Sequence, residues 1–241
     1  MVPEKQIDEF VQKVRTAAGA NLLSVILYGS AAAGNYIVGS SDVNLLFVMR
    51  ETSFSAIAAL SPVIEWWRKQ KHRLPLLLTA EEMRRSADVF SIEFLDMQRT
   101  HRLLWGEDLL KTLEIPMRLH RAQLEYELRE KTILLRQRLL VVAGVEDAKW
   151  DLLLNSLSTF GTLFRHALIA TGDAGAVSKR EAAAQLASKL KVDSGVFAEL
   201  LDVREGKKDR KVARVDEAFA RYLKLVEEVT GAVDKMLDPA A

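Results

Sequence analysis

The fold of this chain is decided by two short stretches, Leu27-Tyr28-Gly29-Ser30 and Asp42-Val43-Asn44-Leu45. The first stretch ends an apolar run rich in β-forming residues, 22–28, which we expect to be a strand that stops at the glycine. The second opens another apolar run, 43–49, of the kind found in strands that are buried on both faces. We therefore expect two core strands joined by a small, glycine-containing segment.

The spacing of these two stretches resembles the active-site signature of the nucleotidyltransferase (polymerase-beta-like) superfamily. In that pattern a Gly-Ser turn follows a strand, and an acid, an apolar residue and a second acid come later. Here Gly29-Ser30 is followed by eleven residues, the last of which is Ser41, and then by Asp42. The second acid of the pattern is replaced by Asn44.

The resemblance extends to the aminoglycoside adenylyltransferase type, which includes kanamycin nucleotidyltransferase. It implies an α+β protein with a small mixed-sheet nucleotidyltransferase-like domain at residues 1–115. An α-helical bundle that binds a substrate or a partner is expected to follow at residues 116–241. Further segments that resemble this type are Phe90-Ser91-Ile92-Glu93-Phe94 and Leu104-Trp105-Gly106-Glu107-Asp108.

The resemblance assigns a chemical role to each residue type of the motif. A glycine after a strand lets the backbone approach phosphate, and a serine hydroxyl adds a donor; a helix starting there would favour the anion further. Residues i and i+2 of a strand share a face, so an acid pair at this spacing can hold two Mg²⁺ ions about 3.5 to 4 Å apart. We therefore expect Gly29, Ser30 and Ser41 to bind a nucleoside triphosphate, and Asp42 and Asn44 to face the metal.

Several departures from the pattern indicate that the site has lost charge. Asn44 can ligate a metal ion but brings no negative charge. The third acid of the family aligns with Leu77, and a common arginine aligns with Ala33. Glu93 is the best candidate for a replacement acid, because we expect it on a neighbouring strand. The alternative for Glu93 is a carboxylate at the rim of the site.

Composition limits the classes of protein that need to be considered. Of the 241 residues, 49% are hydrophobic and 28% are charged, which is typical of a globular protein. The net charge of +1 does not favour nucleic acid as a partner. The absence of cysteine and the polar N-terminus fit a cytoplasmic protein, and no apolar run reaches the roughly 18 residues of a membrane span.

Hydrophobic periodicity and capping signals predict the remaining elements. Thr79 with Glu82 and Ser178 with Glu181 form capping boxes, so helices are expected to begin there. Further strands are expected at 74–78 and 91–95. Helices are expected at 4–18, 54–71, 117–143, 148–171, 178–190, 196–205 and 212–237.

Three functions are consistent with these observations. The first is a degenerate member of the superfamily that binds nucleotide as a binding or regulatory module. The second is an active Mg²⁺-dependent enzyme that moves NMP from an NTP to a hydroxyl of a small molecule or a protein, with Asp42, Asn44 and Glu93 as its catalytic residues. The third is a structural protein that uses the helical bundle to form a homodimer or to bind another protein.

Overall fold

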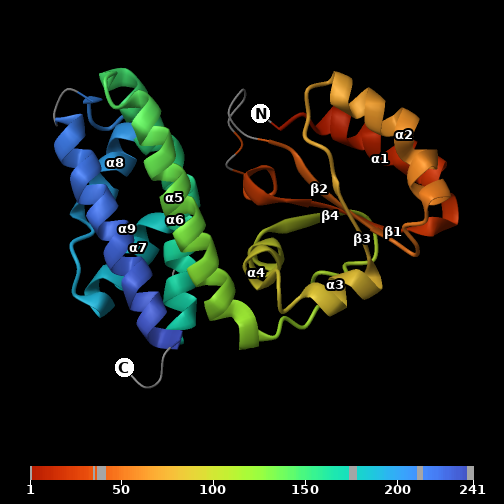
Figure 1. Ribbon diagram of the computed structural model, residues 1–241. Helices are drawn as coiled ribbons and strands as arrows, with labels where there is room; N and C mark the ends of the chain where they lie inside the picture. The colour runs from red at the N-terminus through yellow and green to blue at the C-terminus, as the bar shows by residue number, and fades with distance from the viewer. Residues whose placement is uncertain (1, 35, 37–41, 174–177, 211–213, 238–241) are drawn as a thin grey trace. The chain divides into compact units, whose positions relative to one another are not determined.

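The computed structural model describes residues 2–34, 36, 42–173, 178–210 and 214–237 (Figure 1). The chain divides into two compact units, Met1–Met117 and Arg118–Ala241. The first unit contains helices and a sheet, and the described part of the second unit is helical. The predicted α+β class is confirmed. Among the described residues, no helix is both long and apolar enough to cross a membrane.

A mixed sheet forms the centre of the first unit. Its four strands in the described residues are β1 (Leu22–Tyr28), β2 (Asn44–Met49), β3 (Leu76–Thr79) and β4 (His101–Gly106). The order across the sheet is β3-β2-β1-β4. Strand β2 runs antiparallel to β1 and parallel to β3, and β4 runs antiparallel to β1. The end of β1 and the start of β2 therefore meet at the same end of the sheet, where Tyr28 pairs with Asn44.

Helices cover both faces of this sheet. On one face lie α1 (Glu4–Ala18) and α2 (Phe54–Lys69), whose side chains form a common apolar cluster with β1 and β2. On the other face, residues of α3 (Ala80–Ser86) and α4 (Ser91–Arg99) join a second cluster. Successive residues of a strand point to opposite faces, so both faces of the two central strands must be apolar. This double burial explains the continuous apolar runs of β1 and β2.

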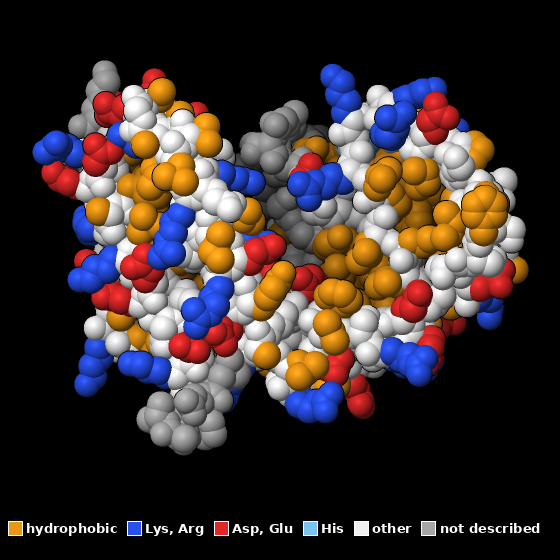
Figure 2. All heavy atoms as spheres, in the orientation of Figure 1, with side chains coloured by type: hydrophobic (Ala, Val, Ile, Leu, Met, Phe, Trp, Pro, Cys, Tyr) orange, Lys and Arg blue, Asp and Glu red, His pale blue; other side chains and the backbone are white. Residues whose placement is uncertain are grey.

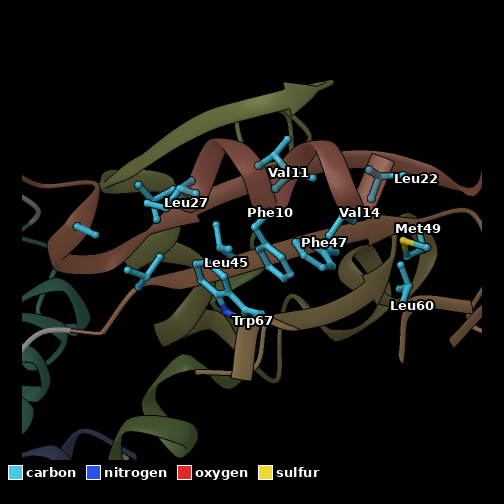
Figure 3. Close-up of a cluster of buried hydrophobic side chains, with 14 residues drawn as sticks. Phe10, Val11, Val14, Leu22, Leu27, Leu45, Phe47, Met49, Leu60 and Trp67 are labelled. Atoms are coloured by element: carbon cyan, nitrogen blue, oxygen red, sulfur yellow. The ribbon is translucent and has the colours of Figure 1, made fainter. Parts of the chain in front are cut away.

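The cluster under α1 and α2 is built around aromatic rings (Figure 3). Phe10 of α1 stacks on Trp67 of α2 with ring centroids 4.1 Å apart. Phe47 of β2 lies 5.7 Å from Phe10, and all three side chains are fully buried. Burying a large aromatic side chain is among the strongest single contributions to a core, so this cluster holds both helices against the sheet.

The predicted strand at residues 91–95 is wrong. These residues begin helix α4, and the strand that follows, β4, was not predicted. In Ser91-Ile92-Glu93-Phe94-Leu95 polar and apolar residues alternate only over the first four positions, a length too short to distinguish a strand from a helix. Strand β4 gives a weak signal because it lies at an edge of the sheet and most of its residues are partly or fully exposed.

The second unit is a helical bundle. The described helices are α5 (His120–Val142), α6 (Glu146–Ala170), α7 (Lys179–Leu190), α8 (Gly195–Arg204) and α9 (Val215–Leu237). Helix α6 contacts each of the others and is buried along much of its length. Both capping boxes are confirmed: Thr79 and Glu82 cap α3, and Ser178 and Glu181 cap α7.

Candidate functional site

Gly29 begins the turn that follows strand β1. Its φ is +76°, which is a left-handed conformation that favours glycine. A Cβ at this position would lie 3.0 Å from Nδ2 of Asn44. The backbone angle therefore favours glycine, and a side chain at this position would in addition press on the Asn44 amide.

Asn44 begins strand β2 and is half-buried beside the turn. It pairs across the sheet with Tyr28, whose side chain packs against the cluster under α3 and α4. Directly paired residues of an antiparallel sheet share a face. Asn44 therefore lies on the α3–α4 face, at the end of the sheet where β1 ends.

Asp42 lies two residues before β2 and is 46% exposed. Its Oδ2 is 2.8 Å from Nε of Arg73, in the loop before β3, and the Arg73 side chain is 69% exposed. The positive charge of Arg73 also lowers the pKa of Tyr28, although burial has the larger effect and leaves that pKa above its ordinary value. Arg73 is thus the cation beside Asp42 at this end of the sheet. Its place in the site was not predicted from the sequence.

The backbone of Arg73 is held by the aromatic cluster of the first unit. Nε1 of Trp67 donates to the carbonyl oxygen of Arg73 at 2.8 Å. His72, the residue before Arg73, is also fixed in place. Its ring stacks on Trp67 with ring centroids 4.0 Å apart, and its Nε2 lies 3.0 Å from Oε1 of Gln6. Trp67 itself is fully buried, so the segment that follows α2 is fixed to the core before it reaches Asp42.

Strand register places Leu77 away from Asn44. Leu77 pairs with Phe47 and packs against the cluster under α1 and α2. Asn44 lies on the opposite face, with Tyr28. The alignment that put Leu77 at the third acid of the motif is therefore wrong in register, because a shift of one residue moves a side chain to the other face of a sheet.

The other predicted residues have varied surroundings. Glu93 is exposed on helix α4 instead of lying on a strand. Ser30 is half-buried in the turn after Gly29, and Ala33 is exposed four residues beyond Gly29, to whose carbonyl its N–H donates at 3.0 Å. Ser41 lies outside the described residues.

The turn after β1 is a single 3₁₀ turn, Gly29–Ala31. From the sequence, a helix could begin at this turn, and its dipole and free N–H groups would then favour an anion. A turn of three residues does not provide the dipole of a long helix. Among the described residues at this end of the sheet, Arg73 supplies a positive charge that an anion could use.

Comparison with solved structures gives the fold. Spectinomycin adenyltransferase AAD(9) from Enterococcus faecialis, solved with ATP and spectinomycin, matches 94% of this chain and 98% of its own. The two structures compare with a TM-score of 0.56, and the two sequences are 15% identical. This chain has a nucleotidyltransferase fold. The predicted resemblance is thereby confirmed for the fold, which extends over both units.

A nucleotidyltransferase-like protein from Exiguobacterium sibiricum is also similar, at 11% identity, with 96% of this chain and 78% of that chain covered and a TM-score of 0.37. No protein-family model matches the chain. No curated protein matches it either.

Within this fold, the residues at the sheet end do not fit a site for two metal ions. Mg²⁺ prefers charged oxygen ligands. Among the described residues, no group of three His, Cys, Asp or Glu side chains is placed to hold a metal ion. Asp42 already faces a guanidinium at 2.8 Å, and Asn44 brings no charge. The arrangement resembles a neutralised ion pair more than a cation site.

Proposed function

We propose that this protein binds a nucleoside triphosphate at the sheet end of its first unit and acts as a nucleotide-binding or regulatory module. The observation that carries the proposal is the ion pair between Asp42 and Arg73. The nucleotidyltransferase fold supports a nucleotide as the ligand, because the similar adenyltransferase was solved with ATP. The lack of a metal-holding group of side chains in the described residues supports a protein with weak or no transferase activity.

The charge of the ligand makes Arg73 the central residue of this proposal. A triphosphate near an unpaired aspartate would be repelled unless a cation lay between them. Arg73 cancels the charge of Asp42, and its guanidinium has five N–H donors in a planar fork suited to phosphate oxygens. With 69% of its side chain exposed, it is accessible to a ligand from solution. We expect Arg73 to take the place of a metal ion as the positive partner of the phosphates.

Calorimetric titration with ATP, GTP, CTP and UTP tests this proposal. We expect at least one triphosphate to bind in the presence of EDTA, and Mg²⁺ to change its affinity little. Arg73→Gln should weaken binding roughly tenfold or more, since a hydrogen bond to a charged group contributes about 1.5–3 kcal/mol.

Arg68→Gln is the matched control. Arg68 is an exposed arginine in the last turn of α2, and its replacement should leave the affinity unchanged. The proposal is wrong if no triphosphate binds at millimolar concentration. It is also wrong if binding requires Mg²⁺ and disappears with EDTA.

Active transfer of NMP to a hydroxyl of a small molecule or protein is the second candidate. It is favoured by the fold match, which covers 98% of an adenyltransferase that was solved with ATP and spectinomycin. In this case Asp42 must leave Arg73, and Glu93, exposed on α4, is the candidate second acid. Incubation with labelled NTPs and Mg²⁺ or Mn²⁺ distinguishes the two functions. Transfer that is lost in both Asp42→Ala and Glu93→Gln would establish the enzyme and overturn the first proposal.

A further inference from the structure

Tyr28 is the last residue of β1 and lies directly before Gly29. It pairs with Asn44 of β2, and directly paired residues of an antiparallel sheet share a face. The Tyr28 ring packs against the apolar cluster under α3 and α4, and the residue is half-buried. The side chains of Tyr28 and Asn44 therefore lie next to each other on the same face, at the end of the sheet where Asp42 and Arg73 pair.

The polar atoms of these two side chains are available for a ligand. Neither the Tyr28 hydroxyl nor the Asn44 amide makes a hydrogen bond to another residue that the structure describes. Nδ2 of Asn44 lies 3.0 Å from the position that a Cβ of Gly29 would take, so its N–H groups lie beside the turn. A tyrosine hydroxyl supplies one donor and an asparagine amide supplies two.

Arg73 brings further donors close to the Tyr28 hydroxyl. Burial raises the pKa of the Tyr28 phenol above its ordinary value, and the charge of Arg73 acts against this, so the guanidinium lies within electrostatic range. Within the described residues Asp42 pairs with Nε alone, which leaves the other N–H groups of Arg73 for a ligand. Neutral and cationic donors thus gather at one place, and phosphate oxygens are acceptors suited to such a set.

The aromatic rings at this end of the sheet offer little to a nucleobase, although proteins often bind bases by stacking. Trp67 donates to the backbone of Arg73, but it is fully buried. Phe10 and His72 stack on it, with ring centroids 4.1 and 4.0 Å from its own. The Tyr28 ring packs against the core cluster. Neither Trp67 nor Tyr28 therefore presents a free ring to a base.

An apolar groove of about 470 Å³ lies between β3 and α2, on the other face of the sheet. Its lining includes Phe47, Leu74 and Leu77. Phe47 and Leu77 belong to the cluster under α1 and α2, whereas Tyr28 packs against the cluster under α3 and α4. Figure 2 shows hydrophobic side chains gathered around a hollow on this part of the first unit. The groove therefore does not extend the donor set.

We propose that Tyr28 and Asn44 complete, with Arg73, a set of donors that binds the phosphate chain of the ligand and leaves its base unread. This inference rests on the proposed nucleotide site, and it adds Tyr28 and Asn44 as ligand contacts. Donors of this kind bind phosphate oxygens without a metal ion. Inorganic tripolyphosphate, which has no base, should therefore occupy the same site as ATP.

Calorimetric titration in EDTA with inorganic tripolyphosphate, ATP, GTP, CTP and UTP tests this proposal. We expect the nucleotides to bind with dissociation constants within about threefold of one another, and tripolyphosphate to displace ATP. Tyr28→Phe keeps the ring and removes the hydroxyl, so it should weaken ATP and tripolyphosphate alike, roughly tenfold. Asn44→Asp replaces two donors by a negative charge and should weaken both ligands by about tenfold or more.

Fluorine NMR reports on Tyr28 directly. The chain has four tyrosines, so the signal of the 3-fluorotyrosine-labelled protein that is lost in Tyr28→Phe belongs to Tyr28. Tripolyphosphate should shift this signal. It should leave the signal of Tyr126 unchanged, because Tyr126 is 63% exposed on α5 of the second unit.

Tyr126→Phe and Asn155→Asp are the matched controls, because they make the same chemical changes at exposed positions of the bundle. Both should leave the affinities unchanged, and circular dichroism checks that every variant is folded. Suppose the parent chain binds ATP, but tripolyphosphate does not displace it or one base is preferred by about tenfold. This inference is then overturned and the proposed function stands.

Two results with the variants would also overturn the inference alone. One is an unchanged affinity in either Tyr28→Phe or Asn44→Asp. The other is stronger binding by Asn44→Asp in Mg²⁺, since an added carboxylate strengthens a metal site. A parent chain that binds no triphosphate overturns the proposed function together with this inference.

Discussion

The two units place their polar residues in opposite environments. At the sheet end of the first unit, Asp42 and Arg73 are 46% and 69% exposed and pair with each other. In the second unit, His120, His166 and Tyr222 are buried within the bundle. Exposed ion pairs contribute little to stability, whereas buried polar groups strongly affect it. The comparison indicates that Asp42 and Arg73 are accessible to a ligand, whereas His120, His166 and Tyr222 contribute to the stability of the bundle.

The largest effect is expected from a substitution that breaks the link between the buried aromatic cluster and the exposed pair of Asp42 and Arg73. Trp67→Ala removes a fully buried ring that stacks on Phe10 and holds the backbone of Arg73. We expect a loss of about 3–5 kcal/mol in the free energy of unfolding, measured by denaturant titration. Binding of a triphosphate should weaken as well, because Arg73 loses its anchor. Trp66→Ala is the control, since Trp66 is only partly buried and should cost less.

The buried histidines of the bundle predict a dependence of stability on pH. Burial, and to a lesser extent the charge of the neighbouring His166, whose ring centroid lies 5.2 Å away, together lower the pKa of His120 to about 4. Between pH 6.5 and 4 the unfolded chain therefore binds more protons at this residue than the folded chain. The contribution of His120 to the free energy of unfolding should be fully present above pH 6.5. It should fall by roughly 1–2 kcal/mol as the pH drops from 7 to 5.

Denaturant titrations of the parent chain and of His120→Gln at pH 7 and pH 5 check this expectation. The fall in stability between these two values should be smaller in the variant, because it lacks the titrating group. An equal fall in both proteins would show that other groups control the pH dependence.

A smaller effect is expected at Tyr222 in the centre of the bundle. Its hydroxyl lies 2.9 Å from Oγ of Ser156, and its ring contacts Phe160 edge-on at 5.7 Å. Tyr222→Phe keeps the ring contacts and removes the hydroxyl, so we expect a loss of about 0.5–1.5 kcal/mol. Ser156→Ala should cost a similar amount. If the double variant costs as much as the two single variants together, the two hydroxyls do not interact.

The smallest effect on stability is expected at the exposed pair itself. Asp42→Asn removes a surface ion pair and should change the free energy of unfolding by less than about 1 kcal/mol. The same change should strengthen triphosphate binding, because it removes a negative charge beside Arg73. A large loss of stability would contradict the comparison between the two units, and weaker binding would indicate that Asp42 contacts the ligand or its cation.

Local signals in the sequence predicted much of the fold. The apolar runs of β1 and β2, the capping boxes at Thr79 and Ser178 and the periodicity of the bundle helices each depend on residues close together in the chain. Prediction was wrong at 91–95, where five residues alternate like a strand but belong to a longer helix. It also missed β4, whose position at the edge of the sheet removes the alternation that marks a half-buried strand.

The candidate site was only partly predictable, because only some of its residues lie close together in the chain. Gly29 and Asn44 were found from their motif, and the structure places them side by side, since Asn44 pairs with Tyr28, the residue before Gly29. The register of β3 and the pairing of Asp42 with Arg73 join residues that are far apart in the chain. Such pairings depend on how the sheet and its aromatic cluster assemble. By itself, the sequence thus determined most of the elements, the turn after β1 and the replacement of an acid by Asn44. Only the tertiary structure decided which cation faces Asp42, because strand register and long-range packing place it there.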